Sequence, residues 1–149
     1  MINRAAQTKN LIIYGDGEQK RSFSDVRDCI IAVERIMKSF RTNLSGQVYN
    51  IGPDDNEMSI IQLATLITQL SEVYVRFDHY PDRPREVKDA YCSSDKIRKE
   101  FNYNAATPAK QTIADMVNWI KPIKREFEYH LPIELITDQT PKTWTDKLI

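Results

Sequence analysis

Apolar positions recur at helical spacing over residues 24–40, which predicts an amphipathic helix. Ser24 is a suitable N-cap, and Asp25 and Asp28 place negative charge at the positive end of the helix dipole. The positions that form the apolar face are Val26, Ile30, Val33, Met37 and Phe40. We expect this helix to flank a strand of a sheet.

A second helix is predicted over residues 59–71, because Ser59 is followed three residues later by Gln62 in a capping-box arrangement. Its buried face is formed by Ile60, Leu63, Ala64, Ile67 and Leu70. The acidic run at 54–57 directly precedes this helix. It lacks the glycine and the twelve-residue register of a calcium loop, so we interpret it as a capping segment.

Short apolar runs predict strands at 11–14, 48–51, 73–77 and 90–92. Ser93 or Ser94 begins a helix that ends at Phe101, where Asn102 tolerates a left-handed terminator. A last helix begins at Thr107-Pro108, with Pro in its first position, and Pro122 ends or kinks it. Its apolar face consists of Ile113, Met116, Val117 and Ile120.

Composition and charge exclude several classes of protein. The 149 residues suffice for one domain, and 21 basic side chains balance 21 acidic ones. This balance gives no overall field that would attract nucleic acid or an anionic membrane. No apolar run is long enough to cross a bilayer, and the N-terminus lacks the apolar core of a secretory signal, so we expect a cytoplasmic location. Cys29 and Cys92 match no metal or redox spacing.

Candidate chemistry begins directly after the strand at 11–14. A turn with Gly15 and Gly17 lets the backbone approach a ligand, and it is followed by the polar segment that carries Gln19 and Arg21. A guanidinium at this place can bind phosphate or carboxylate oxygens in a bidentate fork. An Asp-Gly turn beside a solvated arginine is the ordinary alternative.

A second candidate lies at 79–87, where two prolines favour an extended loop. Arg83 and Arg85 are two residues apart, so on an extended chain they point the same way and one anionic group could contact both. The chain has four glycines, which cannot make the glycine-rich turn of a dinucleotide site. We therefore expect no cofactor to be bound by this chain alone.

The runs YGDGEQKRSFSDVRD, QVYNIGPDDNEMSI and RPREV follow one another in an order that resembles the C-terminal half of the extended short-chain dehydrogenase/reductases. Members of that family are NAD-dependent enzymes that epimerise, dehydrate or decarboxylate nucleotide sugars. The first two runs are similar to the UDP-glucuronate decarboxylase branch, and RPREV is similar to the epimerase and dehydratase branches. The resemblance covers about residues 3–119. The family's Tyr-x-x-x-Lys catalytic pair is absent from the sequence.

The resemblance implies two arginine sites for the diphosphate of the substrate. Arg21 contacts the diphosphate or, as in the decarboxylase branch, lies near enough to the sugar to assist proton transfer. Because the pKa of arginine lies above about 12, the electrostatic role is the better assignment. Arg83 matches the second diphosphate-binding arginine, and Arg85 is the alternative.

Three further residues have implied roles. Glu86 falls near a family position that reaches the ribose hydroxyls. Tyr14 matches an aromatic that lies against the base or the ribose. Gln19 either fixes the loop or bonds the ligand, and the sequence leaves both open.

These inferences predict an α/β fold: a small substrate-binding lobe, plus a strand and helices that complete a Rossmann-type sheet. We expect residues 1–125 to form the nucleotide-sugar-binding C-terminal domain of a larger enzyme, and residues 126–149 to form a tail that includes His130 and Trp144. The expected partners are a nucleotide-diphosphate sugar and the missing N-terminal Rossmann half with its NAD, with self-association through exposed edges. A non-catalytic scaffold domain that kept the fold is the alternative.

Overall fold

The computed structural model describes residues 1–123 and 135–147, so His130 lies outside the described residues. The fold is α/β, as predicted, and none of its described helices is long and apolar enough to cross a lipid bilayer. The helices are α1 (Ile2–Ala6), α2 (Val26–Met37), α3 (Ile60–Ser71), α4 (Asp95–Phe101), α5 (Ala109–Ile120) and α6 (Lys142–Thr145). The strands are β1 (Leu11–Tyr14), β2 (Lys20–Ser22), β3 (Glu57–Ser59), β4 (Phe77–Tyr80) and β5 (Asp89–Ala90).

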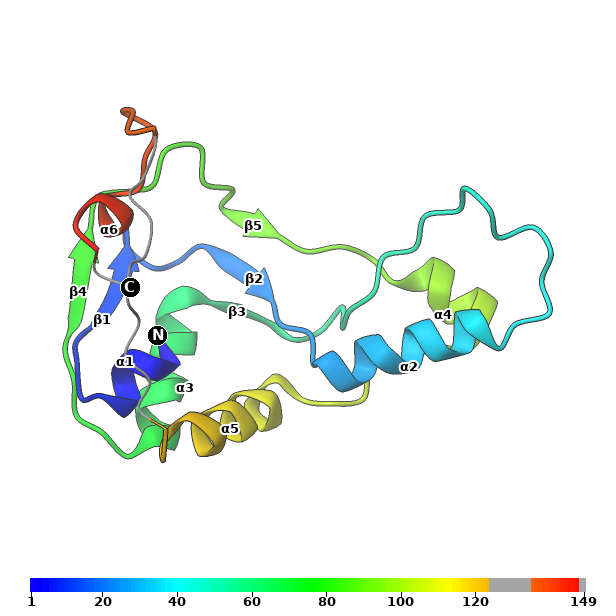
Figure 1. Ribbon diagram of the computed structural model, residues 1–149, viewed down its shortest axis with the longest axis horizontal. Coiled ribbons are helices and arrows are strands. Elements are labelled where there is room, and N and C mark those ends of the chain that lie inside the picture. Colours follow the sequence, from blue (N-terminus) through cyan, green and yellow to red (C-terminus); the bar gives the residue numbers. More distant parts are fainter. Residues whose placement is uncertain (124–134, 148–149) are drawn as a thin grey trace.

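Two small sheets organise the chain (Figure 1). In the first, β1 and β4 are parallel, and their register runs from Leu11 opposite Phe77 to Tyr14 opposite Tyr80. In the second, the central strand β2 is antiparallel to β3 and parallel to β5. Because parallel strands end at the same edge, the turn after β1 and the loop after β4 leave the first sheet side by side.

The main core lies between the first sheet and α1, α3 and α5. Its buried residues include Leu11, Ile13, Leu63, Ala64, Ile67, Ile113 and Val117. The capping box predicted for the second helix is confirmed, because Ser59 Oγ accepts from the Gln62 N–H while Gln62 Oε1 accepts from the Ser59 N–H. Leu63, Ala64 and Ile67, three of the positions predicted for the apolar face of α3, are buried, so apolar periodicity identified this face correctly.

Helix α2 lies beside α4, at the end of the molecule opposite to the first sheet (Figure 1). A second cluster, formed by Ala32, Ile97, Phe101 and Tyr103, joins the two helices. The apolar face of α2 is nevertheless largely exposed, with Val26 68%, Ile30 62% and Met37 80% exposed. The opposite side of α2 packs against the rest of the chain and carries the buried residues Ala32 and Asp28. The Asp28 carboxylate accepts hydrogen bonds from the backbone N–H groups of Ala106 and Thr107.

Several predicted boundaries differ from the structure. Residues 48–51 form no strand, and the strand expected at 73–77 begins only at Phe77. The N-cap of α2 is Asp25 rather than Ser24. The two differences in the strands follow from tertiary pairing, because a segment forms a strand only where another strand supplies its hydrogen-bonding partner.

The acidic run before α3 caps a different helix from the one expected. Asp54 Oδ1 accepts from the Ser94 N–H at 3.0 Å, and Asp54 Oδ2 accepts from Arg98 Nη2 at 2.9 Å, both at the start of or within α4. The Asn102 terminator of α4 is confirmed, with φ 51° and ψ 33°. The negative charge at 54 thus stabilises a helix dipole, although it reaches that helix through space rather than along the chain.

The buried N-cap Asp25 gives a pH-dependent prediction. Hydrogen bonds from the Arg27 guanidinium and backbone, with one from Thr112, hold the pKa of the Asp25 carboxyl well below its usual range, despite burial. Asp25→Asn should lower the free energy of unfolding by about 1–2 kcal/mol at pH 7, because hydrogen bonds to a charged group are lost. Since the folded pKa is depressed, this contribution is present above the unfolded pKa of about 4 and is lost as the pH falls through the folded value.

Urea unfolding of the wild type and the variant between pH 7 and pH 2.5 tests this prediction. Asp115→Asn is the matched control, because Asp115 also pairs with Arg27, at 2.6 Å, but is much more exposed. The control should cost less than about 0.5 kcal/mol at every pH. A difference between Asp25→Asn and the wild type that does not shrink on acidification would contradict the assignment.

Candidate functional site

The glycine turn after β1 is packed too closely for larger residues. Gly17 has φ 81°, and a Cβ there would lie 2.9 Å from Ile13 Cγ2 and 3.2 Å from Ile61 Cβ. The Ile61 N–H also donates to the Gly17 carbonyl at 3.0 Å, which ties the turn to the start of α3. The turn therefore places the following residues in a fixed position relative to the first sheet.

Gln19 lies in this turn and is nine-tenths buried. Its Nε2 donates to the Tyr14 carbonyl at 3.1 Å, and its own carbonyl accepts from the Ile60 N–H at 3.1 Å. Of the two roles that the sequence left open for Gln19, the contacts within the chain are those of a residue that fixes the loop.

Arg21 and Arg83, which are distant in the sequence, meet at one carboxylate. Arg21 Nη2 lies 3.2 Å from Glu86 Oε1, and Arg83 Nη2 lies 2.6 Å from the same oxygen. Arg83 Nε adds a bond to Glu86 Oε2 at 3.2 Å, so the Arg83–Glu86 pair is bidentate. The two guanidiniums therefore share one anion-binding position.

Tyr14 joins this cluster through its ring. The Arg83 guanidinium carbon lies 4.9 Å from the centre of the Tyr14 ring, which is within cation–π range. The Tyr14 hydroxyl donates to Thr143 Oγ1 at 2.6 Å and accepts from the Thr143 N–H at 2.9 Å. One side of the ring thus carries a cation, while its hydroxyl is fixed by α6.

A hollow of about 350 Å³ opens beside this cluster. Its lining residues are Asp16, Gln19, Asp82, Arg83, Arg85, Glu86 and Lys88. Arg85, the alternative to Arg83, has a left-handed backbone with φ 59°, and its side chain makes no hydrogen bond or ion pair within residues 1–123 and 135–147. The structure thus gathers all six residues singled out from the sequence around one place, although Arg21 and Tyr14 stand beside the hollow rather than in its lining.

Lys20, the other cation of the stretch after β1, is directed to a different partner. Its Nζ lies 3.1 Å from Glu57 Oε1 on β3, and this hydrogen bond raises the pKa of Lys20. The neighbouring Arg21 Nη1 donates instead to the Lys88 carbonyl at 3.2 Å. The alternation of side chains along β2 therefore separates one cation from the other.

Sequence reasoning missed three residues that shape this place. Asp82 lies over the turn, since a Cβ on Gly15 would come within 2.0 Å of Asp82 Oδ1. Lys88 lines the hollow, and its carbonyl accepts from both the Lys20 N–H and Arg21. Asp82 and Lys88 flank the quoted RPREV run and could have been included with it, whereas no local signal connects Thr143 with Tyr14.

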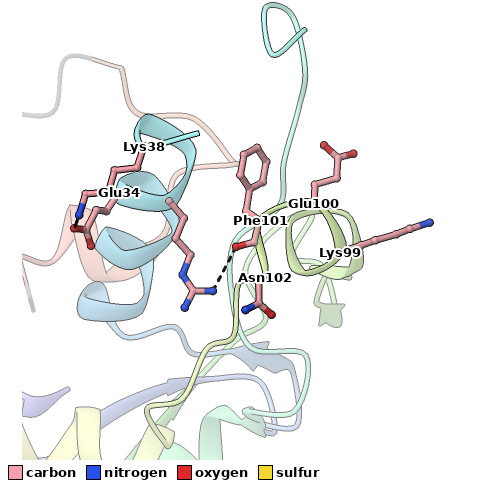
Figure 2. A pocket seen from close by; sticks show the side chains of 7 residues that line it. Glu34, Lys38, Lys99, Glu100, Phe101 and Asn102 are labelled. Atoms are coloured by element: carbon pink, nitrogen blue, oxygen red, sulfur yellow. Dashed lines mark hydrogen bonds and ion pairs between the residues drawn. The ribbon is translucent and has the colours of Figure 1, made fainter. Parts of the chain in front are cut away.

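A larger hollow of about 560 Å³ lies between α2 and α4 (Figure 2). In Figure 2, Lys38 lies against Glu34, with which it forms an ion pair, and Lys99 points away from the other side chains. Arg35 donates to the Phe101 carbonyl at 3.4 Å. The charged side chains of this hollow converge on no common point, so we place the candidate site at the arginine cluster.

A metal site has no support in the part of the chain that the structure describes. Within residues 1–123 and 135–147, no group of three or more His, Cys, Asp or Glu side chains could hold a metal ion. His79 is occupied locally, with Nδ1 2.7 Å from the Gly15 carbonyl oxygen. The groups that the structure brings together at the cluster are the guanidiniums of Arg21 and Arg83, the carboxylate of Glu86 and the ring of Tyr14.

Comparison with known proteins gives consistent matches. A sequence profile of the family described as GDP-mannose 4,6 dehydratase matches residues 1–116. The chain is 29% identical over 131 residues to UDP-N-acetyl-alpha-D-glucosaminuronate decarboxylase from Bacillus cytotoxicus, a match that covers 84% of this chain and 40% of that protein. The chain thus spans about 40% of the length of this curated relative.

Solved structures share the fold. UDP-glucuronic acid 4-epimerase from Bacillus cereus, in complex with UDP-glucuronic acid and NAD, matches with a TM-score of 0.75 and 24% identity over 82% of this chain and 38% of that chain. UDP-glucose 4-epimerase from Thermotoga maritima, with UDP-glucose, matches with a TM-score of 0.75 and 18% identity over 83% of this chain and 38% of that chain. These two structures show that the chain shares their fold. The profile, which covers most of the sequence, shows that the chain belongs to the GDP-mannose 4,6-dehydratase family, a family of extended short-chain dehydrogenase/reductases whose members include NAD-dependent nucleotide-sugar epimerases and dehydratases.

Proposed function

We propose that this chain is the substrate-binding portion of an NAD-dependent nucleotide-sugar epimerase, dehydratase or decarboxylase, and that it holds the nucleotide diphosphate. The observation that carries the proposal is the convergence of Arg21 and Arg83 on one carboxylate, at 3.2 and 2.6 Å. Two guanidiniums that share one anion position suit adjacent phosphate groups. The B. cereus and T. maritima epimerases, which share the fold, were solved with UDP-glucuronic acid and UDP-glucose.

In this proposal the chain's residues position the ligand rather than transfer a proton. Arginine stays protonated at physiological pH, so Arg21 acts on the reaction electrostatically, by holding the diphosphate and the sugar attached to it. Arg83 is the second diphosphate ligand, and Arg85 is its alternative. Tyr14 lies beside the base or the ribose, and Gln19 fixes the turn.

The cofactor belongs to protein outside this chain. NAD would supply the acceptor for a hydride in the intact enzyme, but the four glycines of this chain do not form a dinucleotide-binding turn. The isolated chain is expected to bind UDP or UDP-sugars in the millimolar range, since two arginine contacts without the rest of a cleft provide little more, and to have no turnover.

The partner in this proposal is the cofactor-binding half of the same family fold, and its docking surface is the apolar face of α2. Val26, Ile30 and Met37 are more than half exposed there, which is unusual for successive positions of one helix face. A hollow of about 510 Å³ continues this face toward Met116 and Trp119 of α5. The chain covers only 38–40% of its matched relatives, which supports the remainder of the fold as the occupant.

In this proposal the ligand-binding unit includes α6 in addition to residues 1–125, although the sequence predicted a separate tail over residues 126–149. One contact supports this extension: Thr143 is 5% exposed and both donates to and accepts from the Tyr14 hydroxyl. Trp144, the next residue of α6, is half exposed. In this proposal Thr143 positions Tyr14, and Trp144 is available to a partner.

Arginine replacement tests the ligand site. Arg21→Ala and Arg83→Ala should each weaken UDP binding about tenfold or more, because each removes charge-assisted hydrogen bonds worth roughly 1.5–3 kcal/mol. Binding is measured by NMR titration with UDP, which reaches millimolar affinities. Arg76→Ala is the matched control, since Arg76 precedes β4, at the opposite end of the strand from the cluster, and should leave binding unchanged. UDP binding that is equal in all four proteins, or absent from the wild type, would favour the scaffold-domain alternative.

The α2 face gives a separate prediction. Without its partner half, the isolated chain should self-associate through this face, and Val26→Ser with Ile30→Ser should suppress the association measured by sedimentation velocity. Because both side chains are exposed, the free energy of unfolding should change by less than about 0.5 kcal/mol per replacement. Ile97→Ser is the control, because Ile97 is fully buried and its loss should unfold or strongly destabilise the chain. Association that is unaffected by the α2 variant would remove the face as the docking surface.

A further inference from the structure

Glu86 occupies the centre of the arginine cluster. Its side chain is 15% exposed, against 28% for Arg21 and 43% for Arg83, so the carboxylate is the most enclosed of the three. Both of its oxygens are used, Oε1 by the two Nη2 atoms and Oε2 by Arg83 Nε. The position at which an external anion would meet both arginines is therefore filled by a side chain of the protein itself.

We propose that Glu86 is an internal counter-ion of this site, and that a diphosphate binds by displacing its carboxylate from the two guanidiniums. The inference rests on the proposed function, because it takes Arg21 and Arg83 as the diphosphate ligands. In the free chain Glu86 offsets the repulsion between the two cations and holds their donors directed to one point. The empty site is thus preorganised, and its affinity is lowered by the cost of moving the carboxylate away.

The loop that carries Glu86 permits this exchange. The Glu86 N–H donates to the Arg83 carbonyl at 3.3 Å, and Arg85 between them has a left-handed φ of 59°. This turn fixes the backbone that supports both Arg83 and Glu86, so a rotation of the Glu86 side chain suffices to free both guanidiniums. Arg83 keeps its contact with the Tyr14 ring, 4.9 Å away, which does not involve the carboxylate.

The displaced carboxylate has a place in the bound state. The hollow of about 350 Å³ is lined by Glu86 together with Asp16, Asp82 and Lys88, so the side chain can turn within it without entering the core. Once released, the carboxylate can accept hydrogen bonds from hydroxyl groups of the ligand. Glu86 then has two states. In the free chain it forms ion pairs with the two arginines, and in the bound chain it takes the place near the ribose that the family resemblance implies.

The test uses inorganic pyrophosphate, which has the two phosphate groups but no ribose. Affinities of the wild type, Glu86→Gln and Glu86→Ala are measured on the full chain at one ionic strength by NMR titration. Glu57→Gln is the matched control, because it also removes one negative charge. Glu57 lies on β3, the strand that pairs with the strand of Arg21, but it forms an ion pair with Lys20 and not with the arginines. Urea unfolding of each protein confirms that it is folded.

Both Glu86 variants should bind pyrophosphate about three- to tenfold more tightly than the wild type, as expected for the loss of two partly exposed competing ion pairs. Glu57→Gln should stay within about twofold. The gain for UDP should be smaller than the gain for pyrophosphate, since UDP also loses a contact to its ribose.

Two results would overturn the inference, and they are distinguishable. If pyrophosphate binding depends on Arg21 but is not tightened in either Glu86 variant, the counter-ion role is wrong and the proposed function stands. If pyrophosphate and UDP bind to none of the proteins, or bind equally well to Arg21→Ala, the proposed function fails and the counter-ion role fails with it.

Discussion

The parallel pairing of β1 with β4 is the constraint on which the candidate site depends. Its register sets Tyr14 opposite Tyr80, so the segments that follow, which carry Arg21 and Arg83, leave the sheet at the same edge. Two further ties fix the geometry: Gly17 packs against Ile61 at the start of α3, and the Arg21 side chain reaches the Lys88 carbonyl. Without this pairing the two arginines would lie on unrelated loops, and their common anion position would not exist.

Local patterns in the sequence were sufficient for much of the fold. The strand at 11–14, the Ser59 capping box and the Asn102 terminator were predictable because each depends on residues a few positions apart. The strand expected at 48–51 was wrong, because a strand needs a partner and those residues pair with none in the described chain. Apolar periodicity likewise defined the face of α2, but it carries no information on what covers that face.

The candidate site shows the same division between local and spatial information. The two arginine segments could be singled out from their glycine and proline settings and from the family resemblance. Their meeting at Glu86, the stacking of Arg83 on Tyr14 and the bond from Tyr14 to Thr143 depend on tertiary packing. An apolar core lies under the first sheet, the charged cluster of Arg21, Arg83 and Glu86 lies at its edge, and the apolar face of α2 is exposed.

The most direct test of the account is a UDP titration followed by the NMR signals of the arginine Nε–H groups and the backbone amides of the whole chain. If Arg21 and Arg83 hold the diphosphate, their signals shift together with the amides of 15–19 and 82–88. Shifts confined to the α2–α4 hollow, around Arg35 and Asn102, with the two arginines unchanged, would contradict it.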